Sequence, residues 1–413
     1  MIPVEQALQI VLANLPPRRV EQIALAAALG RVLASDVVAD SNVPPFRRSA
    51  VDGFAVRAAD VSSAPAPLRI TGEVRAGGGV ELRLGAGEAV AIMTGAPVPE
   101  GADAVQMVEH SRRDAPGEVV ICKPVRAGEN IAPLGSEAAA GETVLGAGRV
   151  VGPAEAAILA TFGRARVEVY ARPRVAQLAT GDELVEVDGT PRPDQIRNSN
   201  SHSLKAQLGL LGIEAEYLGI ARDDPDELRR RMVEGLERDV LILTGGVSMG
   251  EYDFVKEVFQ ELGLQILFTR VAMKPGKPTV FARKGDRLVF GLPGNPVSTF
   301  VSFENFVRPA LGRICGLARP DLPRVRGELL RDMKQTPGRT AFLPAWAQWQ
   351  ATGWTVEPLR WKGSADIIGF ARANATVIFP AERDFIARGD QVEAMLLADF
   401  ALRSSAAGAG LRS

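Results

Sequence analysis

A glycine-rich loop behind an apolar run is the strongest candidate for chemistry in this chain. Residues 240–243 read Val-Leu-Ile-Leu and predict a buried parallel strand; residues 244–250 follow as Thr-Gly-Gly-Val-Ser-Met-Gly, and Asp253 comes next. Backbone N–H groups in such a loop can approach an anion closely, so Gly245 and Gly246 indicate a site for a phosphorylated ligand beside a carboxylate. A tight turn and an acid at the start of a helix would explain the same residues without a ligand.

Acidic loops follow two other predicted strands. Thr180-Gly181-Asp182-Glu183 comes after the strand at 175–178, and Asp223 comes after the strand at 214–218. Because open α/β sheets place their ligands at the carboxyl ends of the strands, we expect these loops beside the glycine loop. Glu183 and Asp253 could then share a divalent cation. The alternatives are an acidic helix start at Glu183 and an ordinary Asp-Pro turn after Asp223.

A basic turn, Lys274-Pro275-Gly276-Lys277-Pro278, is a sharper signal. Two lysines bracket a Pro-Gly turn, and lysine is a compact charge suited to phosphate or oxyanion contact. Each charge-assisted hydrogen bond contributes roughly 1.5–3 kcal/mol to the binding of such an anion. A basic turn that only faces solvent would have the same sequence. In the later segment Pro293-Gly294-Asn295-Pro296, Asn295 can cap a helix and Pro296 can take its first position, which would direct the helix N-terminus to the same edge. Capping alone would also account for this segment.

Composition narrows the class of protein. The chain has 413 residues, which predicts roughly two to four domains, and 46% hydrophobic with 23% charged residues is typical of a globular protein. Lys+Arg total 48 against 49 for Asp+Glu, so no basic field indicates nucleic acid. The sequence shows neither a membrane span nor a signal peptide, and we expect a cytoplasmic protein. With 2 histidines and 2 distant cysteines, a zinc site or disulfide framework is not expected, and any metal should be a hard cation such as Mg²⁺ on carboxylates.

The pattern of elements predicts a multidomain α/β fold with a central parallel-sheet α/β domain. Helical spacing at 4–12 and 24–33 predicts a helical N-terminal domain, short β-like runs predict a small β-rich domain, and short strands near the end predict a β-barrel-like domain. The predicted division is 1–45 plus 146–173 (N-terminal helical), 46–145 (β-rich lid), 174–318 (α/β, ligand-binding), 319–400 (C-terminal β) and 401–413 (disordered tail).

These motifs resemble those of one known family, and they occur here in the family's order over residues 1 to about 400. The chain resembles the MoeA and gephyrin E-domain family, the molybdopterin molybdenumtransferases or molybdenum insertases. The motifs that carry the resemblance are Ser49-Ala50-Val51-Asp52-Gly53-Phe54-Ala55-Val56, Ile92-Met93-Thr94-Gly95-Ala96-Pro97, Thr180-Gly181-Asp182-Glu183-Leu184, Gly245-Gly246-Val247-Ser248-Met249-Gly250, Lys274-Pro275-Gly276-Lys277-Pro278 and Pro293-Gly294-Asn295-Pro296.

The resemblance implies a reaction in which adenylylated molybdopterin and molybdate bind, the metal enters the dithiolene, and AMP leaves with the help of Mg²⁺. It implies that carboxylates line the pterin and metal region, and that serine, lysine and arginine contact molybdate. The implied carboxylates are Glu183, Asp223 and Asp253, and the implied molybdate contacts are Ser248, Lys274 and Lys277, with Arg339 and Ser364 from the C-terminal domain. Gly245, Gly246, Arg270, Pro278, Asn295 and Pro296 are the further expected substrate-binding positions.

Family members are dimers, which implies a homodimer whose active site takes Asp52 and Thr94 from the second subunit. Without the resemblance, Asp52 would be a turn acid and Thr94 a strand-end hydroxyl. Transient contacts with the molybdopterin adenylyltransferase and with cofactor-accepting enzymes are further implications, and no nucleic-acid or membrane partner is expected.

Two departures from the family pattern leave alternatives open. Family members usually carry an Arg-containing, Gly-Glu-Asp-like stretch after an Asn-Ile pair, whereas Asn130-Ile131 is followed here by Ala-Pro-Leu-Gly-Ser-Glu, so Glu137 is a weak match. Arg270 stands where the family often has Lys, which keeps the charge but changes the donor geometry. A tungsten-preferring or divergent paralogue, or a scaffold such as gephyrin's E domain, are the alternatives. The retained acids and lysines favour an enzyme, since a scaffold does not need such charges.

Overall fold

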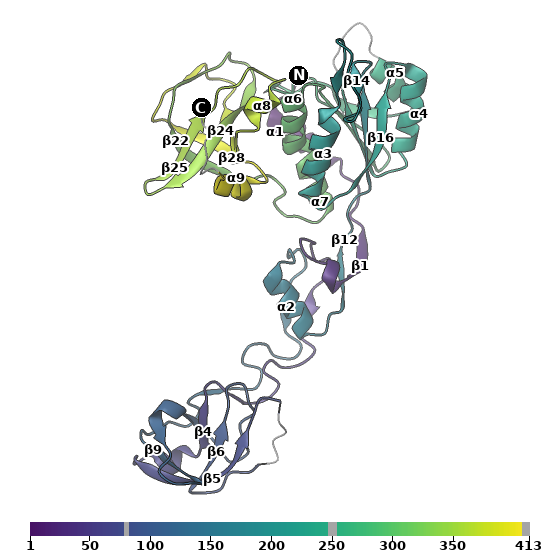
Figure 1. Cartoon of the computed structure of the whole chain (residues 1–413). Helices are drawn as coiled ribbons and strands as arrows, with labels where there is room; N and C mark the ends of the chain where they lie inside the picture. The colour runs from purple at the N-terminus through teal and green to yellow at the C-terminus, as the bar shows by residue number, and fades with distance from the viewer. Residues whose placement is uncertain (78–81, 247–253, 407–413) are drawn as a thin grey trace. The chain divides into compact units, whose positions relative to one another are not determined.

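The computed structural model describes residues 1–77, 82–246 and 254–406 of the chain (Figure 1). These residues form two compact units. The first unit contains residues 1–23, 30–34 and the chain from 168 onward, and the second unit contains residues 24–29 and 35–167. None of the helices in the described ranges is long and apolar enough to cross a bilayer.

A six-stranded sheet is the centre of the described part of the first unit. Its strand order is β16-β13-β17-β21-β20-β18, and the first four strands run parallel, as the sequence predicts. Strand β20 runs antiparallel to both of its neighbours, β21 and β18. Only Gly285 and Asp286 separate β20 from β21, and such a short loop makes a hairpin. The strands are β13 (Val175–Thr180), β16 (Ala215–Ala221), β17 (Val240–Thr244), β18 (Gln265–Phe268), β20 (Val280–Lys284) and β21 (Arg287–Leu292).

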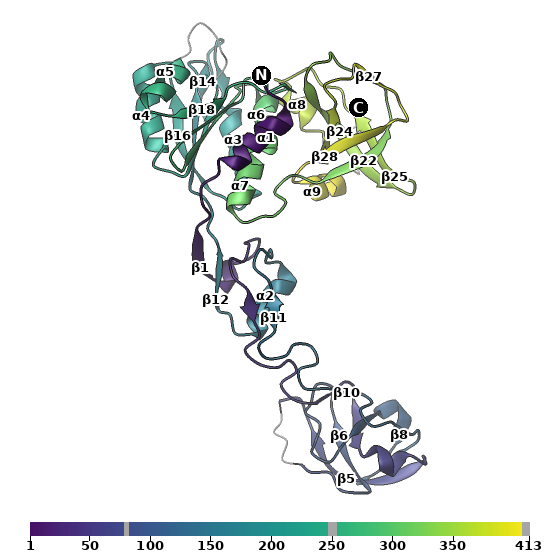
Figure 2. The ribbon, with the colours of Figure 1, turned by 180° about the vertical axis from the view of Figure 1, so that it is seen from behind.

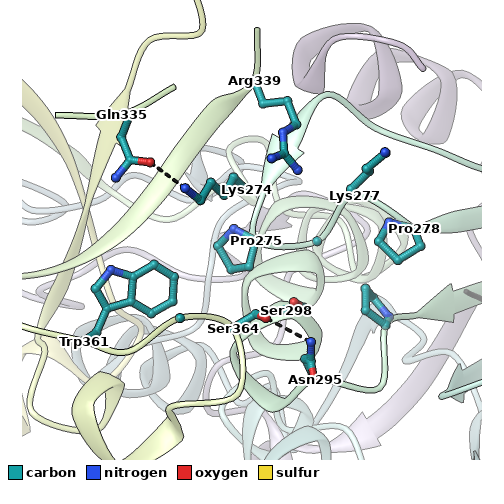
Figure 3. Close-up of a pocket in the computed structure, with 13 residues that line it drawn as sticks. Lys274, Pro275, Lys277, Pro278, Asn295, Ser298, Gln335, Arg339, Trp361 and Ser364 are labelled. Carbon is teal, nitrogen blue, oxygen red and sulfur yellow. Dashed lines mark hydrogen bonds between the residues drawn. The ribbon is translucent and has the colours of Figure 1, made fainter. Parts of the chain in front are cut away.

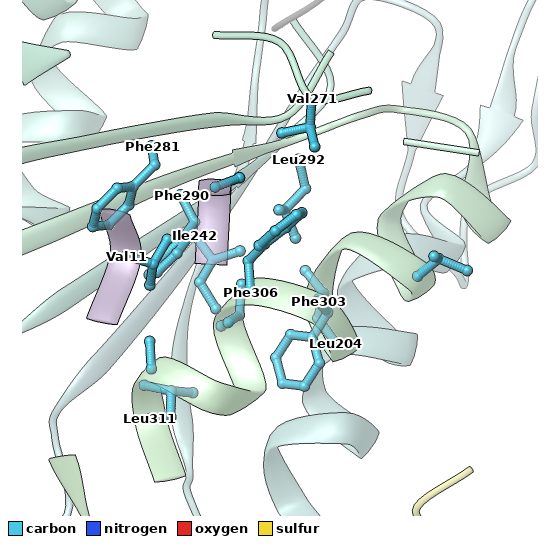
Figure 4. Packing of buried hydrophobic residues seen from close by; sticks show 14 of the residues in the cluster. Val11, Leu204, Ile242, Val271, Phe281, Phe290, Leu292, Phe303, Phe306 and Leu311 are labelled. Atoms are coloured by element: carbon cyan, nitrogen blue, oxygen red, sulfur yellow. The ribbon is translucent and has the colours of Figure 1, made fainter. Parts of the chain in front are cut away.

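Helices cover both faces of this sheet (Figures 1 and 2). Alternation along β17 explains why: Ile242 belongs to the core on one face, while Leu241 and Leu243 belong to the core on the other. Helices α1 (Val4–Ala13), α3 (Ser199–Gly209), α6 (Pro296–Ser302) and α7 (Arg308–Ile314) pack on the first face (Figure 4). Helices α4 (Pro225–Gly235) and α5 (Phe254–Glu261) pack on the second.

Local capping chemistry starts two of these helices. Asn198 Oδ1 accepts a hydrogen bond from Ser201 N at 3.2 Å before α3. Asp224 Oδ1 accepts from Glu227 N at 2.8 Å before α4, whose first residue is Pro225. The helix that begins at Pro296 contains a π-helical segment, Phe303–Val307, between α6 and α7.

The C-terminal part of the first unit is a small barrel-like sheet. Its described strands run in the order β19-β24-β25-β22-β28-β26, and β24 also pairs with β26, which closes the sheet. They are β19 (Met273–Lys274), β22 (Arg324–Leu329), β24 (Thr340–Gln350), β25 (Gly353–Pro358), β26 (Ala375–Phe379) and β28 (Gln391–Leu396). Strand β19 belongs by sequence to the predicted α/β domain, so one sheet joins the two predicted domains.

The start of the predicted disordered tail is ordered in the structure. Helix α9 (Phe400–Ala406) follows the barrel, Phe400 packs against the barrel core, and Arg403 Nη1 donates to the carbonyl oxygen of Ala371 at 2.8 Å. The Ala, Gly and Ser content of the tail predicts disorder, but tertiary contacts stabilise this helix. Residues 407–413 lie outside the described ranges.

The second unit contains the predicted β-rich domain. A six-stranded sheet has the order β7-β4-β6-β5-β9-β8 among the described residues, and helix α2 (Pro153–Thr161) begins directly after its N-cap residue, Gly152. The strands are β4 (Gly53–Val56), β5 (Ala66–Val74), β6 (Glu88–Ile92), β7 (Ala104–Met107), β8 (Ser111–Arg112) and β9 (Glu118–Ile121). Shorter described pairs in this unit are β2 (Val37–Val38) with β11 (Thr143–Leu145) and β3 (Arg48–Ser49) with β10 (Ile131–Ala132). In the first unit, β14 (Leu184–Val185) pairs with β15 (Ile196–Arg197), and β23 (Met333–Lys334) pairs with β27 (Phe385–Ile386).

The predicted helix over residues 24–33 is wrong. This region contains the end of β1 (Val20–Ala24), which pairs with β12 (Arg166–Tyr170), and a single 3₁₀ turn over Leu25–Ala27. Gly30 has φ +73°, a left-handed conformation that ends any helix there. Helix α1 forms as predicted, but its residues Val4, Ala7 and Val11 belong to the core of the α/β sheet. The domain boundaries predicted from the sequence stay a prediction.

Candidate functional site

The carboxyl ends of four described parallel strands lie level with one another. The register pairs Thr180 with Ala221, Ala179 with Thr244, and Thr244 with Leu292. The predicted acidic, glycine and Pro-Gly-Asn-Pro loops therefore leave the same edge of the sheet. Between β13 and β17 the chain first moves outward to β16 and then returns to the other side of β13. Such a reversal of strand order opens the crevice where α/β sheets bind ligands.

The glycine loop is packed tightly against the neighbouring strand end. Gly245 has φ +83°, and a Cβ added there would lie 2.3 Å from the carbonyl oxygen of Thr180. Gly246 has φ +64°. Both positions therefore require glycine for the backbone turn itself. The rest of the motif, including the predicted site residues Ser248 and Asp253, lies outside the described residues.

The acidic residues at this edge include a close pair. Asp223 N donates to Asp182 Oδ1 at 3.3 Å, so the two loops touch. Partial burial raises the pKa of Asp223, and the neighbouring Asp182 carboxylate raises it further. Glu183 is exposed in the adjacent loop. Among the described residues there is no group of three or more His, Cys, Asp or Glu side chains that could hold a metal.

Backbone pairing with β24 and with Ile2 fixes the start of the basic turn. Strand β19 runs parallel to β24, with Met273 opposite Thr340 and Lys274 opposite Ala341. Thr340 N donates to Ala272 O at 3.0 Å, and Ala272 N donates to Ile2 O at 2.7 Å. Because Arg339 directly precedes β24, this pairing brings Lys274 and Arg339 together although they are far apart in sequence.

Two buried hydroxyl groups and a glycine support the lysine turn. Thr279 Oγ1 contacts Gly276 O at 2.7 Å and Ser302 Oγ at 2.9 Å, and both hydroxyl-bearing residues are fully buried. Gly276 has φ +110°, and a Cβ there would lie 2.7 Å from Ser302 Oγ. The lysine turn is therefore a rigid structure that presents its two side chains outward.

These elements enclose a cavity of about 500 Å³ (Figure 3). Its described cationic lining consists of Lys274, Lys277 and Arg339, and no Asp or Glu is found among the described lining residues. Figure 3 shows the Arg339 side chain reaching toward the lysine turn from the opposite side. The remaining lining residues are Pro275, Gly276, Pro278, Pro293, Asn295, Ser298, Gln335, Trp361, Gly363 and Ser364. A cationic wall without carboxylates is suited to an anion.

Hydrogen bonds order the polar wall of the cavity. Lys274 Nζ donates to Gln335 Oε1 at 2.8 Å, and Asn295 Nδ2 donates to Ser364 Oγ at 2.9 Å. Val297 N donates to Ser364 O at 3.0 Å, which attaches the Ser364 loop to the start of α6. Asn295 occupies the predicted N-cap position, but its side chain makes no capping bond and contacts Ser364 instead.

Six predicted site residues thus line one cavity, namely Lys274, Lys277, Pro278, Asn295, Arg339 and Ser364. Other predicted site residues are absent from the described lining of this cavity, namely Glu183, Asp223, Gly245, Gly246, Arg270 and Pro296. Pro296 is the first residue of α6. Sequence reasoning missed Gln335, Ser298 and Trp361 in the cavity and Asp182 at the sheet edge. Asp182 lies inside a motif that was recognised, whereas nothing local distinguishes Gln335 or Trp361.

Asp52 and Thr94 lie together in the second unit. Asp52 Oδ1 accepts hydrogen bonds from Thr94 N at 2.7 Å and from Thr94 Oγ1 at 3.0 Å, and both residues are exposed. These two bonds, the backbone one first, lower the pKa of Asp52. In the same unit the carboxylate of Glu137 pairs with Arg48, so an arginine from another strand stands beside the segment that lacks one.

Comparisons with known proteins agree along most of the chain. Family models match residues 2–163 as the MoeA N-terminal region (domain I and II), residues 176–313 as a probable molybdopterin-binding domain, and residues 326–397 as the MoeA C-terminal region (domain IV). A molybdopterin molybdenumtransferase from Staphylococcus aureus (strain Mu50) is 36% identical over 400 residues, which cover 96% of this chain and 95% of the relative. The namesake enzyme of Bacillus subtilis (strain 168) is 36% identical over 404 residues, 96% of this chain and 94% of the relative.

Solved structures agree with the fold. A molybdopterin biosynthesis moeA protein from Pyrococcus horikoshii OT3 matches with a TM-score of 0.81 at 30% identity, and the match covers 96% of this chain and 100% of that one.

Proposed function

The chain belongs to the MoeA family, and from this premise we propose that it inserts molybdenum from molybdate into adenylylated molybdopterin, with Mg²⁺-dependent release of AMP. Its relatives carry the name molybdopterin molybdenumtransferase. The adenylylated form of the substrate, the role of Mg²⁺ and the release of AMP are the finer parts of the proposal.

The observation that carries the proposal is the cationic cavity. Molybdate is a tetrahedral dianion, and Lys274, Lys277 and Arg339 supply donors of opposite charge around one space. Ser364 adds a hydroxyl that is already ordered by Asn295. A cavity of about 500 Å³ is larger than a single oxoanion needs and falls in the range of small-molecule sites, so it has room for the part of the pterin substrate that receives the metal.

The sheet edge would bind the phosphates and pterin of the same substrate. Gly245 and Gly246 turn the backbone at a strand end, where α/β sheets place phosphates. Gly245 N donates to Leu292 O at 3.2 Å, so a phosphate would meet other N–H groups of the loop. We further propose that Ser248 contacts the oxoanion and that Arg270 adds positive charge beside the turn.

The acidic loops fit the proposed Mg²⁺. The ion usually takes one or two protein carboxylates and completes its shell with water and substrate phosphates. Asp182 and Asp223 meet at the sheet edge. Partial burial and, second, the Asp182 carboxylate raise the pKa of Asp223, and a bound cation would favour its ionised form. Glu183, Asp223 and Asp253 are the proposed ligands, and bound Mg²⁺ would neutralise charge on the departing phosphate.

A second copy of the chain would complete the site. We propose a homodimer in which Asp52 and Thr94 of one subunit face the α/β sheet of the other. The hydrogen bonds from Thr94 keep Asp52 ionised and fix its carboxylate, which suits a polar contact to substrate. Transient contacts with the enzyme that adenylylates molybdopterin and with cofactor-accepting enzymes would follow from this place in the reaction sequence.

Purified protein given adenylylated molybdopterin and Mg²⁺ tests the function. We expect AMP release only after molybdate is added, because hydrolysis without metal insertion would waste the activated substrate. Parallel reactions without Mg²⁺ or with tungstate test the cation and the metal preference. No AMP under any of these conditions would remove the proposed function.

A further inference from the structure

We propose that Gln335 is a positioning residue that holds the Lys274 ammonium at the cavity without cancelling its charge, and thereby sets the affinity of the cavity for a tetrahedral oxoanion. The inference rests on the proposed function in taking molybdate as that anion. Nothing in the chain's local sequence singles out Gln335, and only the three-dimensional arrangement assigns it a role.

The contact between Lys274 and Gln335 has a defined donor and acceptor. Lys274 Nζ lies 2.8 Å from Gln335 Oε1 (Figure 3). An ammonium group has donors only, so the amide oxygen must be the atom that faces it. The Gln335 backbone is itself fixed, because it directly follows β23, which pairs with β27, and its N donates to Asp384 O at 3.0 Å.

Ordering a lysine beforehand should strengthen anion binding. A free lysine side chain loses up to about 2 kcal/mol of rotamer entropy when it is fixed, and a lysine that is already held by an acceptor has lost part of it before the anion arrives. Lys274 is half-buried, whereas Lys277 on the same turn is exposed, so Gln335 orders the more enclosed of the two lysines.

The choice of an amide over a carboxylate preserves the charge of the cavity. A glutamate at position 335 would form an ion pair with Lys274 and would add a negative charge to a lining that has no Asp or Glu among its described residues. The amide accepts the same hydrogen bond while it remains neutral. Among the described hydrogen bonds, Gln335 Nε2 donates to no protein acceptor, so its two N–H groups remain for an oxoanion oxygen.

Equilibrium dialysis of molybdate against the full-length chain, without pterin substrate, tests this role. Gln335→Glu should weaken molybdate binding at least about tenfold, because it pairs with Lys274 and repels the dianion. Gln335→Met, which keeps the length but removes the acceptor, should weaken it about threefold. The control is Gln348→Glu, which adds the same charge at an exposed position on β24 and should leave binding within about twofold of wild type.

A double-mutant cycle separates positioning from a general structural effect. If Gln335 acts through Lys274, then Gln335→Met should have little further effect on molybdate binding in a Lys274→Met background. Unchanged binding by Gln335→Glu, full additivity in the cycle, or no molybdate binding by the wild-type chain would each overturn the inference. Intact Gln335-dependent binding without AMP release would count against the proposed reaction alone.

Discussion

At the residue scale, the proposed anion site depends on positive charges that come from two parts of the sequence. Lys274 and Lys277 bracket a rigid turn, and Arg339 comes from the segment before β24. Each of these side chains can make charge-assisted hydrogen bonds to an oxoanion, which are roughly twice as strong as neutral ones.

The clearest consequence concerns Lys274. Replacing it with alanine should raise the molybdate concentration for half-maximal AMP release roughly tenfold or more, because one charge-assisted hydrogen bond contributes about 1.5–3 kcal/mol. The maximal rate at saturating molybdate should fall less. The matched control is Lys205→Ala, at an exposed position on α3. An unchanged molybdate dependence in Lys274→Ala would remove Lys274 from the oxoanion site.

Asp52 gives a prediction that depends on pH. Its pKa is lowered by the backbone and hydroxyl bonds from Thr94, so Thr94→Val, which removes only the hydroxyl bond, should raise that pKa toward the ordinary value. A carboxylate with a lowered folded-state pKa stabilises the fold above its unfolded-state pKa, and that contribution is lost as the pH falls through the folded-state value. Carboxyl-carbon NMR titration measures the shift. Thr143→Val, at an exposed site in the same unit, should not move the Asp52 pKa.

Residues whose roles are local could be predicted from the sequence, and residues placed by the fold could not. The caps Asn198 and Asp224 act on backbone groups three residues away, so their chemistry is visible in the sequence. Gln335 reaches Lys274 only because β19 pairs with β24, and the paired residues lie more than sixty positions apart in the sequence. The recognised motifs located Lys274 and the sheet edge, and the family resemblance implied Arg339, but neither gave a reason to select Gln335.

At the element scale, level strand ends and tight loops build the ligand edge. The parallel register between β13, β17 and β21 brings the loops together, and Gly245 lets two of them pass at close range. The strand alternation correctly predicted the parallel strands, whose register brings the acidic loops to one edge, and ligand binding at this edge stays a prediction. The predicted helix over 24–33 failed because apolar spacing alone cannot distinguish a helix from a strand followed by a turn.

Gly245→Ala tests the close approach. The added methyl group would lie 2.3 Å from Thr180 O in a left-handed backbone, and we expect a loss of at least about 2 kcal/mol in the free energy of unfolding. Gly219→Ala is the matched control, because Gly219 has φ +87° with nothing within 4 Å of an added Cβ. That variant should lose only the cost of the strained backbone, about 1–2 kcal/mol. Chemical denaturation followed by a probe in the sheet unit measures both, and equal losses would show that the contact with Thr180 does not matter.

At the scale of the whole molecule, the proposed site is shared between two copies of the chain. The cationic cavity belongs to the first unit and Asp52 belongs to the second, so a subunit that lacks either part can still contribute the other. Shared sites of this kind are a common use of dimer symmetry.

Subunit mixing tests the sharing. Asp52→Ala and Lys274→Ala should each be impaired alone, but heterodimers would contain one intact composite site. Random exchange should restore about a quarter of the wild-type rate of AMP release, since half of the dimers are mixed and half of their sites are intact. The control is a mixture of two preparations of the Asp52→Ala variant, exchanged in the same way. No restoration after verified exchange would show that each chain builds its own site.

The most direct measurement is the amount of molybdenum that enters the pterin dithiolene for each AMP released. Purified protein is incubated with adenylylated molybdopterin, Mg²⁺ and molybdate, and the product is tested for its ability to activate a molybdenum-free acceptor enzyme. We predict equal amounts of AMP and inserted molybdenum, with active cofactor as the product. AMP release without molybdenum in the product, or without dependence on molybdate, would contradict the account.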